Sequence, residues 1–477
     1  MTSTDLPATS VRIAGEPTDR DRRITVANPY DGSIVGSVPA LTAEDVQNAC
    51  EHARRVLERD DFPQHRRARV LEVAAELLRG RKEEFGRRIT LESGKPITAG
   101  RAEAERAVDT LSFSAVEARR LAGDLVPLDG SEAGAGRLGF ALRVPVGVVA
   151  AISPFNFPLN LVAHKLGPAI AAGCPVVIKP ASSTPLSAVA LVELLIEAGL
   201  PADWISVVTG SGGEVGNALV DNPIPRLITF TGSAEVGWGI AARAPRKRVR
   251  LELGSTSPVI VEPDADLAHA ARRIRWGGFA QAGQSCISTQ RVLVQASIYE
   301  SFLELLEYEV SSLVCGDPLD ESTDVGPLID PGETDRVQQW IDEAVSQGAR
   351  LVTGGAKENG VLRPTVLADV VPEARVCRAE VFGPVVAVVP YDEFDDAIRL
   401  ANDSDLGLHA GIFTSDLGKA MRAIRSLDFG GVIVNDVSTI RADQQPYGGV
   451  RDSGNTREGP AYTVKEMTEL RFASIPF

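Results

Sequence analysis

One cysteine, one glutamate and one asparagine stand in surroundings where each could take part in acyl chemistry. Cys286 follows the glycine-containing turn Gln281-Ala-Gly-Gln-Ser, whose backbone amides could point at the sulfur and favour the thiolate. Glu252 ends an apolar run, where poor solvation would raise the pKa of the carboxyl group and suit it to act as a general base on water. Asn156, within Pro154-Phe-Asn-Phe-Pro158, follows a strand-like run, and its amide could donate to a developing oxyanion.

Each of these residues also has an ordinary structural interpretation. A single cysteine such as Cys286 is more often a small buried hydrophobic residue than a nucleophile. Glu252 could cap the turn that follows it, and Asn156 could cap the next helix. Only the combination of the three residues favours catalysis over these alternatives.

Three further segments have the residue types that bind a dinucleotide. Lys179 ends the run Val176-Val-Ile-Lys, where it could bond ribose hydroxyls or a phosphate. The segment Phe230-Thr-Gly-Ser233 predicts a strand, a tight turn and a helix start, whose free amides suit a pyrophosphate. Glu380-Val-Phe-Gly-Pro384 offers a carboxylate for a sugar hydroxyl and a ring to flank a flat heterocycle, although a glycine turn is its ordinary interpretation. The stretch from Phe230 does not contain the strict GxGxxG dinucleotide motif, so its glycine turn is a weak signal by itself.

The composition limits the classes of partner. Of the 477 residues, 44% are hydrophobic and 24% charged, as in ordinary globular proteins, and the length predicts two or more structural units. The net charge of −15 disfavours nucleic acid and anionic lipid as partners, and the basic run Arg243–Arg250 is interpreted as a solvated strand end. Five scattered cysteines without CxxC spacing predict neither disulfides nor a metal site.

Neither a secretory signal nor a membrane span is predicted. Residues 1–10 are polar and lack the basic and apolar regions of a signal peptide. The one membrane-like window, Val144–Ala163, is interrupted by prolines and asparagines, so a strand, a turn and a helix start explain it better. We therefore expect a cytoplasmic protein.

Alternating helical and strand-like patterns place the chemical residues on an α/β fold with a largely parallel sheet. Thr42 is a predicted N-cap of one amphipathic helix, and Thr184-Pro185 opens another that ends near Gly199. The stretch Leu121–Arg143 is rich in glycine and predicts a hairpin. Strands are predicted at Val146–Ile152, Val176–Ile178, Ile205–Thr209, Leu227–Thr231, Val249–Leu253, Val259–Val261 and Val292–Val294.

In order and spacing these motifs resemble the aldehyde dehydrogenase superfamily, from about Asn28 to about Gly459. The resemblance implies that Cys286 is the nucleophile, that Glu252, 34 residues upstream, is the base, and that Asn156 forms part of the oxyanion hole. It implies an NAD or NADP cofactor and a small-molecule aldehyde as substrate. The implied cofactor contacts are Lys179, Ser182, Phe230, Gly232, Ser233, Glu380, Phe382, Phe155 and Ser153.

The resemblance also implies an organisation into three parts and a homodimer or homotetramer. A Rossmann-like dinucleotide-binding domain is expected over residues 1–121 and 144–253, and an α/β catalytic domain over 254–445. A small β element over 122–143 and 446–477 is expected to join the subunits.

Three positions depart from the common pattern of the family. Ser182 stands where relatives that prefer NAD often carry glutamate, so the charge that would repel a 2′-phosphate is missing and NADP becomes the favoured cofactor. Ser255 replaces a glycine and Phe155 a tryptophan. We expect these two changes to adjust the nicotinamide site locally without loss of chemistry.

The substrate is less defined, and several side chains bear on it. Arg106 and His164 resemble positions that relatives use for anionic aldehydes, but Ser285 stands where those relatives often carry arginine. Arg441 could supply that missing cation, or could be an ordinary solvated arginine. Phe157 is the remaining candidate contact. Phosphonoacetaldehyde, glyceraldehyde 3-phosphate, lactaldehyde and succinate semialdehyde all remain open as substrates.

Two other classes compete with this interpretation. A phosphorylating or CoA-acylating reductase would form the same thioester, but Glu252 argues against it because hydrolysis is the step that needs a water-activating base. A non-catalytic relative that retains only the fold is disfavoured by the complete set of Asn156, Glu252 and Cys286.

Overall fold

The computed structural model describes residues 8–358 and 360–477, and a five-stranded parallel sheet forms the centre of its first half. The strand order is β11-β10-β7-β8-β9. Every strand overlaps a predicted range, because apolar, β-branched runs suit strands that helices cover on both faces. The five are β7 (Val149–Ile152), β8 (Val176–Lys179), β9 (Ile205–Val207), β10 (Leu227–Thr231) and β11 (Arg248–Glu252).

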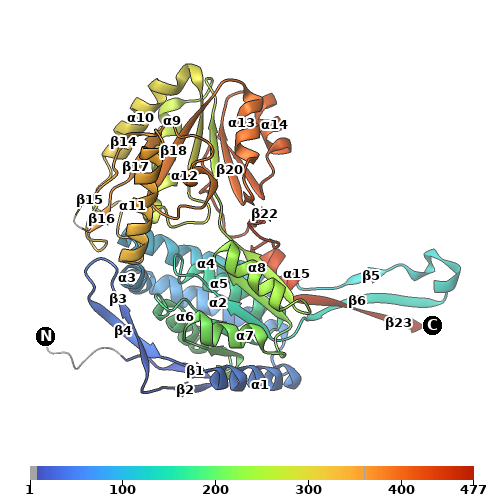
Figure 1. The fold of residues 1–477 in the computed structure, drawn as a ribbon. Coiled ribbons are helices and arrows are strands. Elements are labelled where there is room, and N and C mark those ends of the chain that lie inside the picture. Colours follow the sequence, from blue (N-terminus) through green and yellow to red (C-terminus); the bar gives the residue numbers. More distant parts are fainter. Residues whose placement is uncertain (1–7, 359) are drawn as a thin grey trace.

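Helices cover this first sheet and form one hydrophobic core with it, which is the blue and green lower half of the molecule in Figure 1. Short antiparallel pairs, β1 (Val11–Ile13) with β2 (Glu16–Thr18) and β3 (Arg23–Ala27) with β4 (Ile34–Pro39), precede the helices. The helices are α1 (Ala43–Arg59), α2 (Gln64–Gly80), α3 (Lys82–Ser93), α4 (Ile97–Arg120), α5 (Asn160–Ala172), α6 (Leu186–Glu197), α7 (Asn217–Asp221) and α8 (Ala234–Arg243).

A second sheet, of seven strands in the order β14-β17-β18-β13-β12-β20-β21, forms the upper half in Figure 1 with its own core. Only β14 runs antiparallel to its neighbour. The strands are β12 (Pro258–Val261), β13 (Arg291–Gln295), β14 (Arg350–Thr353), β17 (Thr365–Ala368), β18 (Val385–Tyr391), β20 (His409–Phe413) and β21 (Gly431–Val434). The helices are α9 (Leu267–Phe279), α10 (Tyr299–Ser311), α11 (Pro331–Ser346), α12 (Arg375–Arg378), α13 (Phe394–Asn402) and α14 (Leu417–Ser426). Two small pairs are β15 (Lys357–Glu358) with β16 (Val361–Leu362), and β19 (Leu406–Gly407) with β22 (Val450–Arg451).

The two predicted helix starts differ in how their first amides are satisfied. Thr42 caps α1 as expected, in a reciprocal capping box with Asp45. At the second start, α6 begins at Leu186, and Thr184 does not cap it. Instead the buried carboxylate of Glu92 accepts hydrogen bonds from the amides of Leu186 (2.7 Å) and Ser187 (2.9 Å). A residue distant in the sequence therefore takes the place of the local cap.

The predicted hairpin is present and forms an arm that projects from the body of the protein (Figure 1). It consists of β5 (Asp124–Val126) and β6 (Arg137–Pro145), and the C-terminal strand β23 (Thr468–Pro476) pairs with β6 along its whole length. Helix α15 (Pro460–Glu466) leads into β23 and packs on α4 and α5. The last residues of the chain thus complete a three-stranded sheet with residues from its first third.

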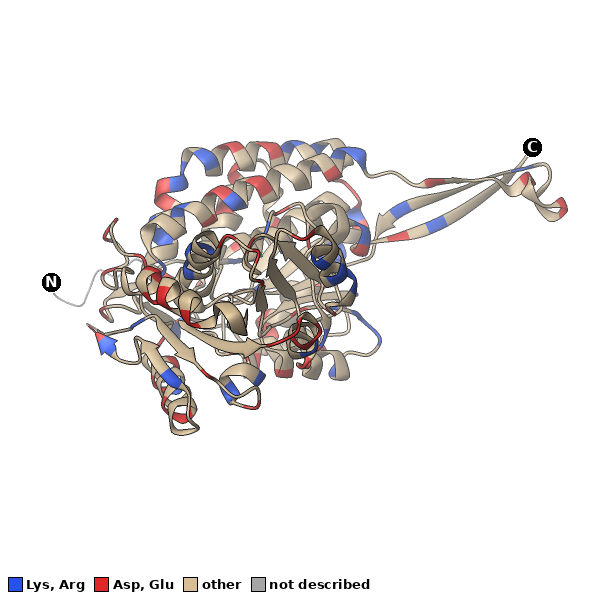
Figure 2. Cartoon of the chain, turned by 90° about the horizontal axis from the view of Figure 1, so that it is seen from above, with Lys and Arg blue, Asp and Glu red and all other residues tan. Residues whose placement is uncertain are grey.

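Charged residues of both signs are interspersed over the face shown in Figure 2. In the basic run that precedes and enters β11, Arg243, Arg248 and Arg250 pair with Asp221, Glu469 and Glu466, respectively. These ion pairs agree with the interpretation as a solvated strand end. Within residues 8–358 and 360–477, no helix is both long and apolar enough to span a bilayer.

Candidate active site

A strained turn between α9 and β13 presents Cys286 to a cavity. Gln281, Ala282 and Gly283 lie in the left-handed region, with φ of 53°, 54° and 70°. A Cβ on Gly283 would lie 2.1 Å from the carbonyl oxygen of Gly383, so only glycine fits at that position. Two consecutive non-glycine residues in this region cost free energy, as is common at functional sites. The sequence predicted a glycine-containing turn here, and the turn is present.

Asn156 lies against this turn, held by hydrogen bonds in both directions. Its side-chain Nδ2 donates to the backbone carbonyl oxygen of Gln284 (3.0 Å), and the side-chain Nε2 of Gln281 donates to the backbone carbonyl oxygen of Asn156. Asn156 does not cap α5, whose first amides are satisfied by Glu103, so the helix-cap interpretation is wrong. An amide group has two donor hydrogens. One of those of Asn156 has no partner among the described residues, and the other is bonded to Gln284, two residues before Cys286 along the turn.

Glu252 is the last residue of β11, and its carboxylate has no hydrogen-bond partner among the described residues. The side chain is buried, and because neither oxygen accepts a hydrogen bond from a described residue it does not cap the following turn, which the alternative interpretation required. Burial, and then the negative charge of Glu458, raise the pKa of Glu252 well above its usual range. The Glu252 charge in turn acts on the Cys286 thiol, which places the two groups in one electrostatic environment.

Cys286, Asn156 and Glu252 thus come together although they belong to three separate parts of the chain. Burial, and then the charge of Glu252, raise the pKa of the Cys286 thiol to about 12, whereas a hydrogen bond with Tyr447 and the charge of Arg441 lower it. The backbone amide of Cys286 donates to no backbone carbonyl among the described residues. That amide and one hydrogen of the Asn156 side chain are therefore donors without a partner in the described part of the site.

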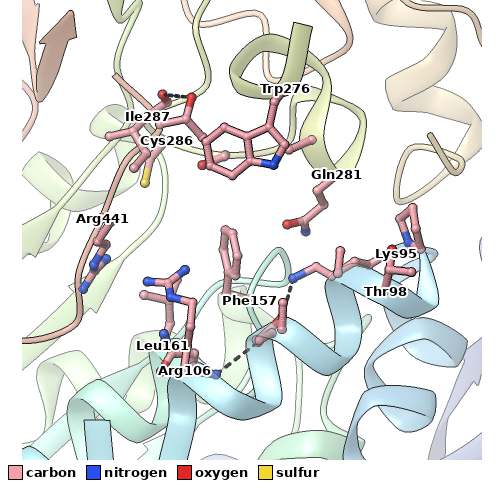
Figure 3. Close-up of a pocket in the computed structure, with 18 of the residues that line it drawn as sticks. Lys95, Thr98, Arg106, Phe157, Leu161, Trp276, Gln281, Cys286, Ile287 and Arg441 are labelled. Carbon is pink, nitrogen blue, oxygen red and sulfur yellow. Dashed lines mark hydrogen bonds and ion pairs between the residues drawn. The ribbon is translucent and has the colours of Figure 1, made fainter. Parts of the chain in front are cut away.

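A cavity of about 380 Å³ opens onto Cys286 (Figure 3). Four of the predicted substrate residues, Arg106, Phe157, Ser285 and Arg441, line it. In Figure 3 Cys286 and Arg441 lie toward one side of the cavity and Thr98 toward the other, and the Arg106 guanidinium and the Lys95 ammonium both lie over the Phe157 ring, 5.8 and 3.9 Å from its centroid. Further lining residues that the sequence did not single out are Lys95, Glu103, Asn160, Trp276, Asp324, Thr439 and Tyr447.

His164, by contrast, does not line the cavity, because its side chain is completely buried behind it. Its Nε2 lies 2.9 Å from Asp443 and 3.2 Å from Arg441. Burial, followed by the charge of Arg441, lowers the pKa of His164. Its geometry is that of a residue that positions Asp443 and Arg441, without contact to a molecule in the cavity.

Both cavity arginines are held by carboxylates that the sequence analysis missed. The Arg106 guanidinium donates twice to Asp443 (2.8 and 3.1 Å), and Arg441 donates to Glu458 (3.0 Å). Arg441 is only 6% exposed, so the interpretation as a solvated arginine is wrong. The available signal was the spacing Arg441-Ala-Asp443 just before Pro446-Tyr-Gly-Gly449. It could not show that Asp443 faces Arg106 across 337 residues of sequence.

The predicted cofactor residues lie largely at the carboxyl edge of the first sheet. The strand register pairs Ile152 with Lys179 on one side and with Phe230 on the other. Ser153, Lys179 and the turn at Gly232 therefore lie at the same ends of three neighbouring strands. Lys179 is buried and bonds only the Pro180 carbonyl (3.2 Å), and burial lowers its pKa to about 8. At least two of its three donor hydrogens therefore remain unused.

Other observations agree with a dinucleotide at this edge. Among the residues that the structure describes, the buried Ser153 hydroxyl has no partner, and no side chain caps the first turn of α8 after Ser233. Ser182 donates to the Gly210 carbonyl (2.8 Å). Ser285 lines both the cavity at Cys286 and a small hollow bordered by Glu380 and Phe382.

Two phenylalanine rings, the Glu380 carboxylate and Gly254 lie at the other side of this proposed cofactor site. Phe382 meets Phe155 edge to face at 5.8 Å, and burial raises the pKa of Glu380 to about 7. A Cβ on Gly254 would lie 2.1 Å from the Glu380 carboxylate, so a larger residue there would displace that carboxylate. The free donors on one side and the carboxylate and ring on the other fit a nicotinamide dinucleotide.

The aldehyde dehydrogenase family model matches residues 16–473. The chain belongs to this family. A 3-sulfolactaldehyde dehydrogenase from Priestia aryabhattai is 46% identical over 472 residues, with 99% of each chain covered. The family, its α/β fold and the class of NAD(P)-dependent oxidoreductase predicted from the motifs are thereby confirmed.

Two solved aldehyde dehydrogenase structures are similar over almost the whole chain. An enzyme from Physcomitrella patens, in complex with the reaction product succinate, has a TM-score of 0.95 and 39% identity, with 99% of each chain covered. An NADP-dependent glyceraldehyde-3-phosphate dehydrogenase from Bacillus halodurans, complexed with NADP, has a TM-score of 0.96 and 37% identity, with 98% and 99% covered.

Proposed function

We propose that this aldehyde dehydrogenase oxidises a short aldehyde with a terminal anionic group to the carboxylate, through a thioester on Cys286. The observation that carries the proposal is the cavity whose lining joins Cys286 with two arginines, Arg106 and Arg441. Arg441 lies over the ring of Tyr447, whose hydroxyl contacts the sulfur, so an anion held by Arg441 would be only a few bonds from the aldehyde carbon. The named relatives act on or bind sulfolactaldehyde, succinate and glyceraldehyde 3-phosphate, which all fit this class.

The first step uses Cys286 as a thiolate. Its sulfur attacks the aldehyde carbon and forms a C–S bond, while the carbonyl oxygen becomes an oxyanion that the Asn156 side chain and the Cys286 amide stabilise. The chemistry that NAD(P)+ supplies when bound is the acceptance of a hydride, and loss of that hydride from the tetrahedral adduct leaves an acyl thioester on Cys286. Lys179, Ser153, Ser182, Phe230, Gly232, Ser233, Glu380, Phe382 and Phe155 are the residues that would hold the cofactor.

Glu252 acts in the second half of the reaction. Its carboxylate takes a proton from a water molecule, and the resulting hydroxide attacks the thioester carbon. The C–S bond then breaks, which releases the carboxylic acid and returns Cys286 as a thiolate. The unpartnered Glu252 oxygens in a buried setting support this role, because they leave both acceptors open to water.

A substrate panel tests the proposed class. Short aldehydes with a terminal sulfonate, phosphate or carboxylate should have a higher kcat/KM than neutral aldehydes of equal length. Arg106→Met should raise KM for the anionic members by roughly 10- to 100-fold and leave neutral members nearly unchanged, because it removes a charged contact and exposes Asp443 to the anion. Arg119→Met is the matched control, since Arg119 lies on the same helix and pairs with Glu72 at the surface. Equal effects of Arg106→Met on neutral and anionic aldehydes would rule out this specificity.

The cofactor preference is expected to favour NADP, because Ser182 carries no charge to repel a 2′-phosphate. The ratio of kcat/KM for NADP to that for NAD should exceed one, and Ser182→Glu should lower the ratio by about tenfold or more. Ser183→Glu adds the same charge at the exposed neighbouring residue and should lower it less. A wild-type preference for NAD would contradict this prediction.

The domain roles follow from the two cores. The first core runs from Val11 to Leu253 and also takes in Val464 and Met467, and the second begins at Val259, which supports a dinucleotide-binding domain of residues 1–121 and 144–253 and a catalytic domain of 254–445. The arm of residues 122–143 with 446–477 is proposed to join subunits into a homodimer or homotetramer.

Exposed apolar side chains on the arm support this assembly, among them Leu142, Leu470 and Phe472. Phe472→Asp is expected to shift the mass measured by analytical ultracentrifugation toward the monomer, because a charge would be buried in the interface. Ile424→Asp, on α14, places the same charge on a comparably exposed residue and should leave the mass unchanged. A wild-type monomer at micromolar concentration would refute the assembly.

A further inference from the structure

The Tyr447 hydroxyl is the polar side-chain group that contacts the Cys286 sulfur. Its oxygen lies 2.8 Å from Sγ, and the Tyr447 side chain is buried at the wall of the cavity. When Cys286 is a thiol, either group can donate. When Cys286 is a thiolate, the sulfur has no hydrogen, so Tyr447 is necessarily the donor.

Tyr447 is held in place from several directions. Its backbone forms an antiparallel bridge with Glu458, and its ring meets the His409 ring edge to face at 5.0 Å. The guanidinium of Arg441 lies over the same ring, 3.7 Å from its centroid, and is itself bonded to Glu458. These contacts hold the Tyr447 ring so that its hydroxyl stays against the sulfur.

The charges around the sulfur disfavour a thiolate, so a hydrogen-bond donor at the sulfur would offset their effect. Glu252 and Glu380 face it with carboxylates, and both disfavour a thiolate, as burial does. Arg441 is the cation that opposes them, while burial lowers the pKa of His409 to about 4 and keeps it neutral. Burial, and then Cys286 and Glu252, raise the pKa of Tyr447 well above its usual range, so the phenol keeps its proton at neutral pH.

We propose that Tyr447, backed by the Arg441 cation on its ring, is a further catalytic residue that stabilises the Cys286 thiolate by a direct O–H···S hydrogen bond. This role rests on the proposed function, in which Cys286 is the nucleophile. The thiol proton leaves to solvent in the cavity, and Tyr447 retains its own proton throughout. The cation over the ring makes the hydroxyl hydrogen a stronger donor, since it draws electron density from the phenol oxygen.

The test is the pH dependence of the rate at which iodoacetamide alkylates Cys286, measured by mass spectrometry of the peptide that contains it. Tyr447→Phe keeps the ring and its stacking on Arg441 but removes the hydroxyl. We expect the apparent pKa of the Cys286 thiol to rise by about one to two pH units, as loss of a hydrogen bond to a charged group predicts. At a fixed pH below that pKa, alkylation should slow by roughly 10- to 100-fold.

Tyr299→Phe is the matched control, because Tyr299 is also buried with a bonded hydroxyl but does not line the cavity. It should leave the alkylation profile unchanged. Site-specific 3-fluorotyrosine at position 447 preserves the shape of the side chain and makes the phenol a stronger acid, so it should lower the thiol pKa. This second measurement keeps the test decisive where Tyr447→Phe folds poorly.

An unchanged or lowered thiol pKa in Tyr447→Phe, or an unchanged pKa with 3-fluorotyrosine, would overturn the inference. The proposed function fails separately, through retention of aldehyde oxidation by Cys286→Ala. Loss of turnover in Cys286→Ala together with an unshifted profile in Tyr447→Phe would therefore reject the role of Tyr447 alone.

Discussion

Cys286→Ala is expected to lose aldehyde oxidation completely, a reduction in kcat of roughly 10⁴-fold or more, as when the nucleophile of a covalent mechanism is removed. Without the sulfur no C–S bond forms, and the oxyanion donors have no tetrahedral adduct to stabilise. Binding of NADP should survive, because Lys179 and the sheet edge that would hold the cofactor are untouched by the change. Steady-state turnover and cofactor binding by calorimetry measure the two properties separately.

Cys315→Ala is the control for this variant. Cys315 is also a free, partly exposed cysteine in a loop, but it does not line the cavity. Its replacement should leave kcat and KM near the wild-type values. Measurable oxidation by Cys286→Ala above the background of a buffer blank would reject the covalent mechanism.

Glu252→Gln is expected to separate the two halves of the reaction. The variant should release one equivalent of reduced cofactor per active site in a rapid burst and then slow by roughly 10²- to 10⁴-fold, the usual contribution of a general base. The amide cannot take a proton from water, so the thioester on Cys286 accumulates. Quenched-flow measurement of the burst and intact-mass detection of the acyl-enzyme check both parts.

The pH profile gives a second readout on the same residue. Because burial raises the pKa of Glu252, the carboxylate is the minor form at low pH, and hydrolysis by the wild type should increase as pH rises through that pKa. Glu252→Gln should lose this rising limb. Glu92→Gln is the control, since Glu92 is also buried, with a pKa raised by burial to about 7, but caps α6 away from the cavity. A full steady-state rate in Glu252→Gln would rule out the assignment.

The strands of the first sheet, and β12 and β13 of the second, were predicted because their signal is local, whereas the other five strands of the second sheet were not predicted. Runs such as Leu227–Thr231 are apolar and end at turn residues, and the observed strand has the same bounds. The second helix start was predicted less well, because the partner of its first amides is Glu92, about ninety residues upstream, and no local pattern reports that contact.

The three proposed catalytic residues could also be found from the sequence, through motifs whose members lie a few residues apart. The residues that surround these three could not be found in this way. Tyr447 contacts Cys286 across 161 residues, and Asp443 contacts Arg106 across 337. His164 was predicted to contact the substrate, but the packing of α5 turns it to the interior, where it bonds Arg441 instead.

The sequence by itself determined the family, the α/β fold and the set Asn156, Glu252 and Cys286, because short-range spacing and apolar patterning encode strands, turns and the residues at their ends. Only the tertiary structure decided which charges surround that set. Ion pairs such as Arg106 with Asp443 form between segments that meet only after both sheets have packed, so the charge of the cavity is a property of the folded chain.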